Sequence, residues 1–309
     1  MKFAAIDIGS NAVRLLLSQV FENGKNPIFK KESLIRIPIR LGEDTFKMQY
    51  ISDTKVKKLT RTLIAFKYLM DTYEPVDYIA CATSAMREAK NKNEIVKNIK
   101  LNSGISVEIV DGKREAEILY SNHAKQVLDK KKSYLSIDVG GGSTEITIFS
   151  NYKVVDANSF NIGTVRVLEQ TVPASLRKRM KKWLKKYTMN HRAMVAIGSG
   201  GNINKLFRMA RIPDGKPITY QKLKSLYEDL VSYSFEDRIR ILKMRPDRAD
   251  VIIPACEIFL SVMNWSKIKK MYVPQIGLAD GLVHLLYEKY KQKLEVQKKR
   301  DEIQISMPF

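Results

Sequence analysis

The feature that most constrains the fold of this chain is a strand–turn–strand unit that occurs twice. Apolar residues 2–8 lead into the turn Gly9-Ser10-Asn11, and a second apolar run follows directly. Residues 134–139 and the turn Gly140-Gly141-Gly142-Ser143 repeat this order, again with an apolar run after the turn. Two such copies in one chain predict two similar domains that face a cleft.

Strand and helix patterns alternate after the first unit, which is typical of an α/β fold. Apolar periodicity predicts helices over 53–70, 85–100, 113–128, 219–232, 235–243, 248–265 and 278–299. Short apolar runs predict strands at 77–83, 107–110, 193–197 and 271–275. We expect two domains, 1–124 and 125–309, the second with helical insertions and a C-terminal helix that packs back on the first.

Composition excludes several classes of protein. With 44% hydrophobic and 28% charged residues, the chain is globular rather than disordered or collagen-like. Cys81 and Cys256 are its only cysteines and indicate a reducing compartment. No apolar run approaches the ~18 residues of a membrane span, and the N-terminus lacks a signal-peptide pattern. We therefore expect a cytoplasmic protein with no membrane partner.

The net charge of the chain is +21, from 54 Lys and Arg against 33 Asp and Glu. Such a charge concentrates polyanions near the protein. It also serves solubility in general, so by itself it does not identify a ligand.

Three glycine-rich turns follow three predicted strands. The third, Gly198-Ser199-Gly200-Gly201-Asn202, comes after the strand at 193–197 and opens a helix. Glycine permits close approach, so that successive backbone amides can point at one anion, and a helix N-terminus adds to this effect. We predict phosphate binding by Ser10, Asn11, Gly140, Gly141, Gly142, Ser143, Gly200 and Gly201. The nucleotide-binding patterns of P-loop and dinucleotide folds do not occur.

Carboxylates lie at the strand ends beside these turns. Asp7 and Asp138 end the first strand of each unit, and Glu145 begins the last strand of the second. A carboxylate repels phosphate unless a hard cation lies between them, and Mg²⁺ binds one or two carboxylates together with substrate oxygens and water. Aspartate near a turn also commonly accepts hydrogen bonds from turn amides. Because the pattern is duplicated, we favour metal binding or water positioning for Asp7, Asp138 and Glu145.

Two further charged residues lie near predicted helix starts. Glu115 lies in the first turn of the helix over 113–128, where the helix dipole alone favours a carboxylate. Arg87 lies in the first turn of the helix over 85–100, where the same dipole disfavours a cation. A residue placed against local preference indicates a partner, and a guanidinium binds phosphate oxygens bidentately.

Residues 177–186 are the densest basic segment, with no acidic residue among them. Beneath the charges, Met180, Trp183, Leu184 and Tyr187 have the spacing of an apolar helix face. The segment is therefore predicted to be an amphipathic helix with a cationic outer face. Such a face is either solvated or a track for a long polyanion. The candidate track consists of Arg177, Lys178, Lys181, Lys182 and Lys185.

The chain resembles the exopolyphosphatase/guanosine pentaphosphate phosphatase (Ppx/GppA) family in its short two-domain form. The matching segments are AIDIGSNAVRLL at 5–16, ATSAMREAKN at 82–91, EIVDGKREAEILY at 108–120, IDVGGGSTEITI at 137–148, NIGTVRV at 161–167 and AIGSGGNINKL at 196–206. The resemblance spans nearly the whole chain. It implies an actin-like ATPase architecture, in which two RNase H-like domains surround a cleft.

The resemblance also implies roles for individual residues. Glu115 corresponds to the family's catalytic base, which activates water, and Arg87 to an arginine that contacts phosphate. Asp138 and Glu145 correspond to its Mg²⁺ ligands. The implied reaction is hydrolysis of a terminal phosphoanhydride, in which positioning and electrostatics dominate. A homodimer is a further implication.

The resemblance is incomplete at two places. Ala255 follows Pro254 where the family usually has glycine, and Ala279-Asp280 stands where many members have Arg-Glu. These departures leave open the shape of the distal part of the cleft, and with it the preferred substrate length.

The sequence leaves several functions open. We favour an exopolyphosphatase that releases orthophosphate from polyphosphate ends, because a linear polyanion needs a cationic path. A guanosine pentaphosphate (pppGpp) 5′-phosphatase is the alternative and would need a guanine pocket. An actin-like kinase or chaperone ATPase is less favoured, because the segments that contain Arg87 and Glu115 favour hydrolysis without a second acceptor. A non-catalytic polyanion sensor is less favoured, since Glu115, Asp138 and Glu145 are intact. Nucleic acid is not an expected partner.

Overall fold

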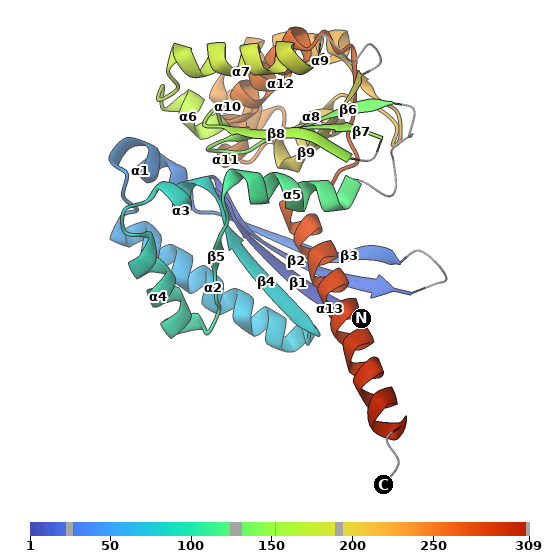
Figure 1. Ribbon diagram of the computed structural model, residues 1–309. Coiled ribbons are helices and arrows are strands. Elements are labelled where there is room, and N and C mark those ends of the chain that lie inside the picture. The colour runs from blue at the N-terminus through green and yellow to red at the C-terminus, as the bar shows by residue number, and fades with distance from the viewer. Residues whose placement is uncertain (23–26, 124–131, 152, 189–193, 307–309) are drawn as a thin grey trace.

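The computed structural model describes residues 1–306 except 23–26, 124–131, 152 and 189–193. Its first sheet has the strand order β3-β2-β1-β4-β5 (Figure 1). The strands are β1 Lys2–Ile8, β2 Ala12–Phe21, β3 Ile28–Pro38, β4 Asp77–Ala82 and β5 Glu108–Ile109. Strands β1, β2 and β3 pair antiparallel, whereas β1, β4 and β5 run parallel.

The second sheet has the strand order β10-β11-β9-β6-β7-β8. The strands are β6 Ser133–Val139, β7 Thr144–Ser150, β8 Lys153–Phe160, β9 Met194–Ser199, β10 Ile218–Thr219 and β11 Lys270–Tyr272. Strands β6, β7 and β8 pair antiparallel, and β6, β9 and β11 run parallel. Both sheets thus contain an antiparallel triplet that continues into parallel strands, which confirms the duplicated α/β fold expected from the sequence.

Helices cover both sheets. With the first sheet lie α1 Leu41–Met48, α2 Asp53–Tyr73, α3 Ser84–Glu88, α4 Lys92–Ser103, α5 Gly112–His123 and α13 Leu278–Ser306. With the second lie α6 Thr164–Leu168, α7 Ala174–Thr188, α8 Gly200–Met209, α9 Tyr220–Ser232, α10 Phe235–Arg240, α11 Pro246–Ala249 and α12 Ile252–Trp265. We call each sheet with its helices the first half and the second half; Figure 1 shows them stacked, with α5 between the sheets.

Each half has its own apolar core. Leu63 and Phe66 of α2 pack on one face of the first sheet, and Ile118 of α5 with Leu282 of α13 pack on the other. The second core includes Phe259 of α12 together with the inward side chains of β6 and β9. Burial of these side chains on both faces of each sheet fixes the strand ends, and with them the turns.

The C-terminal helix lies against the first half although it follows the second half in the chain. Phe3 of β1 makes edge-to-face contacts with Tyr287 and Tyr290 of α13, with ring centroids 6.3 and 5.9 Å apart. The expected domain boundary after residue 124 falls at residues 124–131, outside the described residues, and stays a prediction. Within the described ranges, no helix combines the length and apolarity needed to cross a membrane.

The helix expected over 85–100 is divided into α3 and α4. Asn91 causes the break, because its side chain accepts a hydrogen bond from the Ile51 amide at 3.1 Å and donates to the Ile51 carbonyl at 2.9 Å. The Lys90 amide likewise donates to the Gln49 carbonyl at 2.8 Å. These bonds to a remote segment replace the helical bonds that a continuous helix would have made here.

Candidate functional site

A cleft of about 550 Å³ lies between the two halves. Its walls come from the turns after β1 and β6, the start of α8, the inner end of α5, and strand β3. The segment from Pro274 to Asp280, which leads into α13, completes the lining. The two duplicated turns therefore lie at one cavity, as the expected cleft between similar domains requires.

The first two glycine-rich turns have the same backbone arrangement. The amide of Gly9 donates to the Ala12 carbonyl at 3.1 Å, and the amide of Gly140 donates to the Ser143 carbonyl at 2.9 Å. Each bond closes the hairpin between the two strands of its unit. The third turn differs because Gly200 has φ +87° and begins helix α8. A residue with a Cβ is strained at this φ.

The turn of the second half packs directly on the first half. A Cβ on Gly142 would lie 2.3 Å from Ser84 Oγ, and one on Gly141 would lie 3.0 Å from Ser10 Cβ. The hydroxyls of Ser10 and Ser84 are themselves 3.0 Å apart. Glycine is required in this turn because the halves approach so closely.

Four acidic side chains lie close together at this junction. Asp7 pairs with Arg14, and Asp138 accepts a hydrogen bond from Ser199 Oγ at 3.0 Å. Glu145 accepts one from Ser159 Oγ at 2.8 Å. Glu115 is the fourth. Asp7, Glu115 and Glu145 belong to residues at most 9% exposed, whereas Asp138 is partly exposed. Their negative charges are therefore held close together in a poorly solvated volume.

Glu115 has a cationic partner on the first half. Arg87 Nη1 lies 3.5 Å from Glu115 Oε2 and donates to the Val110 carbonyl at 2.6 Å. The carbonyl bond holds the guanidinium at the edge of the site, and one edge of it faces Glu115. Arg87 therefore orients this carboxylate in the structure.

Burial and mutual repulsion shift the titration of three of these carboxyls. Burial, followed by the charge of Glu145, raises the pKa of Glu115 well above its usual range. Burial raises the pKa of Asp138 to about 6, with a contribution from Asp7. Burial likewise raises the pKa of Glu145 to about 7, with a contribution from Asp138. Carboxyls that perturb one another in this way are characteristic of functional sites.

A group of arginines on the cleft wall was not predicted from the sequence. The group consists of Arg14, Arg36, Arg208 and Arg248. Arg248 Nη1 donates to Asn202 Oδ1 at 2.8 Å, and burial followed by the charge of Arg36 lowers the pKa of Arg248 to about 9. Arg36 pairs with Asp247 through Nη1, while its Nε and Nη2 make no hydrogen bond to the described part of the chain. Buried guanidiniums with unused donors favour an anionic ligand.

Only Arg14 gave a sequence signal that could have been used. It stands opposite Asp7 in the hairpin register, so a hairpin at the first turn brings the two charges together. Arg36 lies on β3 and Arg248 on α11, elements that the sequence pattern does not place near one another.

The predicted phosphate-binding and acidic residues lie at or next to the cleft. The cleft wall includes Asp7, Ser10, Asn11, Glu115, Asp138, Gly140, Gly141, Ser143, Gly200 and Gly201. The other three residues predicted for this site, Arg87, Gly142 and Glu145, are described by the structure but do not line the cleft. They lie next to residues that do. The roles of these residues stay predictions.

The predicted polyanion track lies elsewhere. Its residues are on α7, whose Met180 and Leu184 are buried in the second core. Figure 1 shows α7 on the side of the second half that faces away from the first sheet. None of the described α7 residues lines the cleft.

Asp138 and Glu145 are the candidate ligands for a hard cation at this site. Across the described ranges, no three His, Cys, Asp or Glu side chains are arranged as a ready metal cage. Mg²⁺ does not require one, since it binds one or two carboxylates and takes its other ligands from substrate and water. Asp138 and Glu145 supply oxygen donors whose charged forms are destabilised without a counter-charge. The donor chemistry at these two residues therefore fits Mg²⁺.

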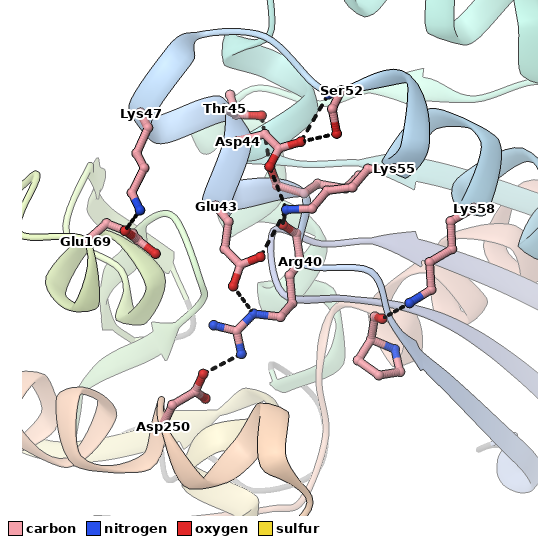
Figure 2. A network of polar contacts seen from close by, with 12 residues as sticks. Arg40, Glu43, Asp44, Thr45, Lys47, Ser52, Lys55, Lys58, Glu169 and Asp250 are labelled. Atoms are coloured by element: carbon pink, nitrogen blue, oxygen red, sulfur yellow. Dashed lines mark hydrogen bonds and ion pairs between the residues drawn. The ribbon is translucent and has the colours of Figure 1, made fainter. Parts of the chain in front are cut away.

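Ion pairs join the two halves beside the cleft (Figure 2). Arg40, which precedes α1, pairs with Asp250 of the second half and with Glu43. Lys47 of α1 pairs with Glu169, which follows α6. The start of α1 is in turn fixed by Lys55, Nζ of which lies 3.0 Å from Glu43 and 2.7 Å from Asp44.

The model of the Ppx/GppA phosphatase family matches residues 27–290. The chain therefore belongs to the Ppx/GppA phosphatase family. The crystal structure of an exopolyphosphatase from Cytophaga hutchinsonii superposes with a TM-score of 0.81 over 94% of this chain and 98% of that one, at 23% identity. That likeness establishes the shared fold.

Two curated relatives illustrate the range of the family. Exopolyphosphatase 1 of Mycobacterium tuberculosis is 22% identical over 304 residues, which cover 92% of this chain and 87% of that protein. The bifunctional 3-dehydroquinate synthase/phosphatase of Fusobacterium nucleatum is 33% identical over 171 residues, which cover 54% of this chain. The match spans only 26% of the Fusobacterium protein.

Proposed function

We propose that this protein is an exopolyphosphatase, which releases terminal orthophosphate from inorganic polyphosphate by attack of water. One observation carries the proposal: Glu115, a buried carboxyl with a raised pKa, lies in a cleft with glycine-rich turns and the arginine group. Those are the elements needed to deprotonate water beside a bound phosphate. Family relatives named exopolyphosphatase support this choice of substrate.

In the proposed reaction, Glu115 acts as the general base. It accepts a proton from water, and the water oxygen attacks the terminal phosphorus. The bond between that phosphorus and the bridging oxygen breaks, and the electron pair leaves with the shortened polyphosphate. Arg87 holds the Glu115 carboxylate in position through the 3.5 Å contact. General base catalysis of this kind contributes typically ~10²- to 10⁴-fold.

Backbone amides and cations bind the substrate in this proposal. The turns at Ser10, Gly141 and Gly200 surround the terminal phosphate from both halves, and their amides stabilise negative charge on its oxygens. Arg36 and Arg248, both in the cleft lining, bind phosphates further along the polyphosphate, because two buried guanidiniums that repel one another favour an anion beside them. Positioning and electrostatics dominate phosphoryl transfer, so this arrangement needs no covalent intermediate.

Asp138 and Glu145 would hold Mg²⁺, which as a Lewis acid polarises a phosphoryl oxygen. Ser199 and Ser159 fix the orientation of these two carboxylates through their hydroxyls. Hydrogen bonds of this kind orient ligating groups toward a metal. Asp7 is paired with Arg14, so of the three predicted metal ligands it is the least available to a cation.

A pppGpp 5′-phosphatase is the second candidate. The observation that favours it is the apolar part of the cleft wall, where Leu34, although 54% exposed, lies in the lining with Pro274 and Ile276. An apolar surface next to arginines could pack against a nucleobase while the phosphates lie toward Glu115. The same catalytic residues would serve both substrates.

Orthophosphate release should be measured on long polyphosphate, tripolyphosphate and pppGpp, with Mg²⁺ and with EDTA. We expect the highest kcat/KM on long polyphosphate and loss of activity in EDTA. Glu115→Gln should lower kcat about 10²- to 10⁴-fold. The matched control is Glu117→Gln on the same helix, where the exposed side chain pairs with Arg114. A preference for pppGpp would select the second candidate, and full activity of Glu115→Gln would overturn the assignment of the base.

The compartment and the oligomeric state of the protein can also be proposed. Cys81 and Cys256 are both buried free thiols, and burial raises the pKa of each to about 12. This fits a reducing, cytoplasmic compartment. We also propose a homodimer from the family resemblance, and analytical ultracentrifugation of the full chain would detect it.

A further inference from the structure

Helix α7 carries a set of cations that the cleft does not use. Seven of its residues are basic and none is acidic: Arg177, Lys178, Arg179, Lys181, Lys182, Lys185 and Lys186. Within the described residues, none of the seven forms an ion pair with an acidic side chain. By contrast, Arg36, Arg40 and Arg166 elsewhere in the chain all pair with carboxylates.

The cations of α7 are spaced so that they repel one another. Lys178 and Lys182 are four residues apart, as are Lys181 and Lys185, so each pair adjoins on the helix surface. Like charges at this spacing destabilise a helix. The helix keeps its place because Met180 and Leu184, at most 1% exposed, anchor its other side in the second core. The outward face is therefore a fixed row of positive charge.

The anchoring also limits what this face can bind. Its apolar stripe is buried in the protein and cannot insert into a lipid bilayer. Trp183 and Tyr187 lie partly buried with ring centroids 5.1 Å apart, and Trp183 also contacts Phe160 at 5.7 Å. These rings pack inward and on one another, which leaves no outward platform for stacking nucleobases. A polymer of phosphates without bases fits the face best.

From these observations we infer that the outer face of α7 is a second binding site for inorganic polyphosphate, separate from the cleft. The inference rests on the proposed exopolyphosphatase function. Since α7 contributes no described residue to the cleft wall and faces away from the first sheet (Figure 1), a short substrate in the cleft does not reach it. Only a long chain can occupy both sites, so α7 retains long polyphosphate while its end is hydrolysed.

The test is a binding measurement without turnover. Labelled long-chain polyphosphate, tripolyphosphate and single-stranded RNA are titrated with the full chain in EDTA, at several salt concentrations. The variant replaces Lys178, Lys181, Lys182 and Lys185 by Gln, a residue with helix propensity similar to that of Lys. The control variant replaces Lys57, Lys90, Lys97 and Lys222 by Gln; all four are exposed and lie outside α7. Both variants therefore carry the same net charge.

We expect the α7 variant to lose at least about tenfold in affinity for long polyphosphate, because four sites of counterion release are removed. The slope of log Kd against log salt should fall by about 3. Affinity for tripolyphosphate, and all affinities of the control variant, should stay unchanged. Equal losses of affinity in the two variants would overturn the proposal. Binding of RNA to α7 as tightly as polyphosphate binds would also overturn it. The binding test needs no hydrolysis. Failure of the proposed function would appear as absence of phosphate release from polyphosphate, whereas failure of the second binding site would appear as equal losses of affinity in the two variants.

Discussion

Arg166 of α6 joins the second half to Glu88 of α3, and its Nη2 donates to both carboxylate oxygens. The same guanidinium donates through Nε to the Gly142 carbonyl at 2.7 Å and lies 3.8 Å from the ring centroid of Phe46 on α1. One buried arginine thus holds the second glycine-rich turn and the first half together. Together with the pairs of Arg40 and Lys47 (Figure 2), it fixes the width of the cleft.

Glu88→Gln should lower the free energy of unfolding by about 1–3 kcal/mol, because Arg166 is 8% exposed and keeps its charge without its partner. Urea denaturation followed by circular dichroism measures the change. The control is Asp71→Asn, which breaks the surface pair of Lys67 and Asp71 on α2. That pair should contribute less than about 0.5 kcal/mol. A Glu88→Gln effect no larger than the control would show that the pair does not hold the halves.

Much of the site could be predicted from the sequence because its parts are local. A strand that ends in aspartate and a glycine-rich turn depend on neighbouring residues only, so Asp7, Asp138 and the turn residues could be found from pattern. The duplicated fold followed from the repetition of that pattern. Both sheets bear this out.

The rest depends on contacts between remote segments. Arg36 and Arg248 meet only because β3 and α11 face the same cleft, and neither element carries a motif. The break between α3 and α4 depends on Asn91 binding Ile51, which lies 40 residues away. Strand β3 escaped prediction because it is a partly exposed edge strand with charged residues among its apolar ones.

The buried carboxyls should make stability depend on pH. The pKa values of Asp138 and Glu145 in the folded protein are about 6 and about 7, above their ordinary values. The folded state therefore binds more protons than the unfolded state, and stability falls as pH rises from about 4 to 7. Asp138→Asn should make this fall in stability smaller, by roughly 3 kcal/mol between about pH 4 and 7.

Thermal melts of both proteins across that pH range, in EDTA, measure this effect. A second series with Mg²⁺ near neutral pH should raise the melting temperature of the unsubstituted protein, because a ligand that binds only the folded state stabilises it. Asp138→Asn should respond less to Mg²⁺. A wild-type melting temperature that rises steadily over this pH range would contradict the expected sign.

Substitution of Arg248 should have opposite effects on stability and on substrate binding. Burial and the charge of Arg36 hold the pKa of Arg248 at about 9, so its charged form is unfavourable in the free protein. Arg248→Gln should stabilise the free protein by about 1 kcal/mol. The same change should raise the KM for tripolyphosphate about tenfold, because a charge-assisted contact to phosphate is lost.

Arg208→Gln provides the comparison for Arg248, because Arg208 also belongs to the cleft wall but is more exposed. Its substitution should raise KM without a gain in stability. Melting temperature and steady-state kinetics on the same preparations separate the two effects. If Arg248→Gln lowers both stability and affinity, the arginine is a structural residue and not a phosphate ligand.

Gly200 should be essential for a reason beyond its backbone conformation. It has φ +87°, and a Cβ there would lie 2.8 Å from Asp138 Oδ1. Gly200→Ala should therefore strain the backbone and also displace the Asp138 carboxylate from Ser199. The expected result is a loss of stability of about 1–2 kcal/mol from the left-handed conformation, together with loss of phosphate release.

Gly215→Ala separates these two causes. Gly215 has a similar φ of +78°, but a Cβ there would meet no atom within 4 Å. It should lose a comparable amount of stability to backbone strain and keep its activity and its Mg²⁺ response. If both alanine variants keep full activity, the position of the Asp138 carboxylate does not control the reaction. If both lose it alike, general destabilisation accounts for the effect and the contact between Gly200 and Asp138 has no special role.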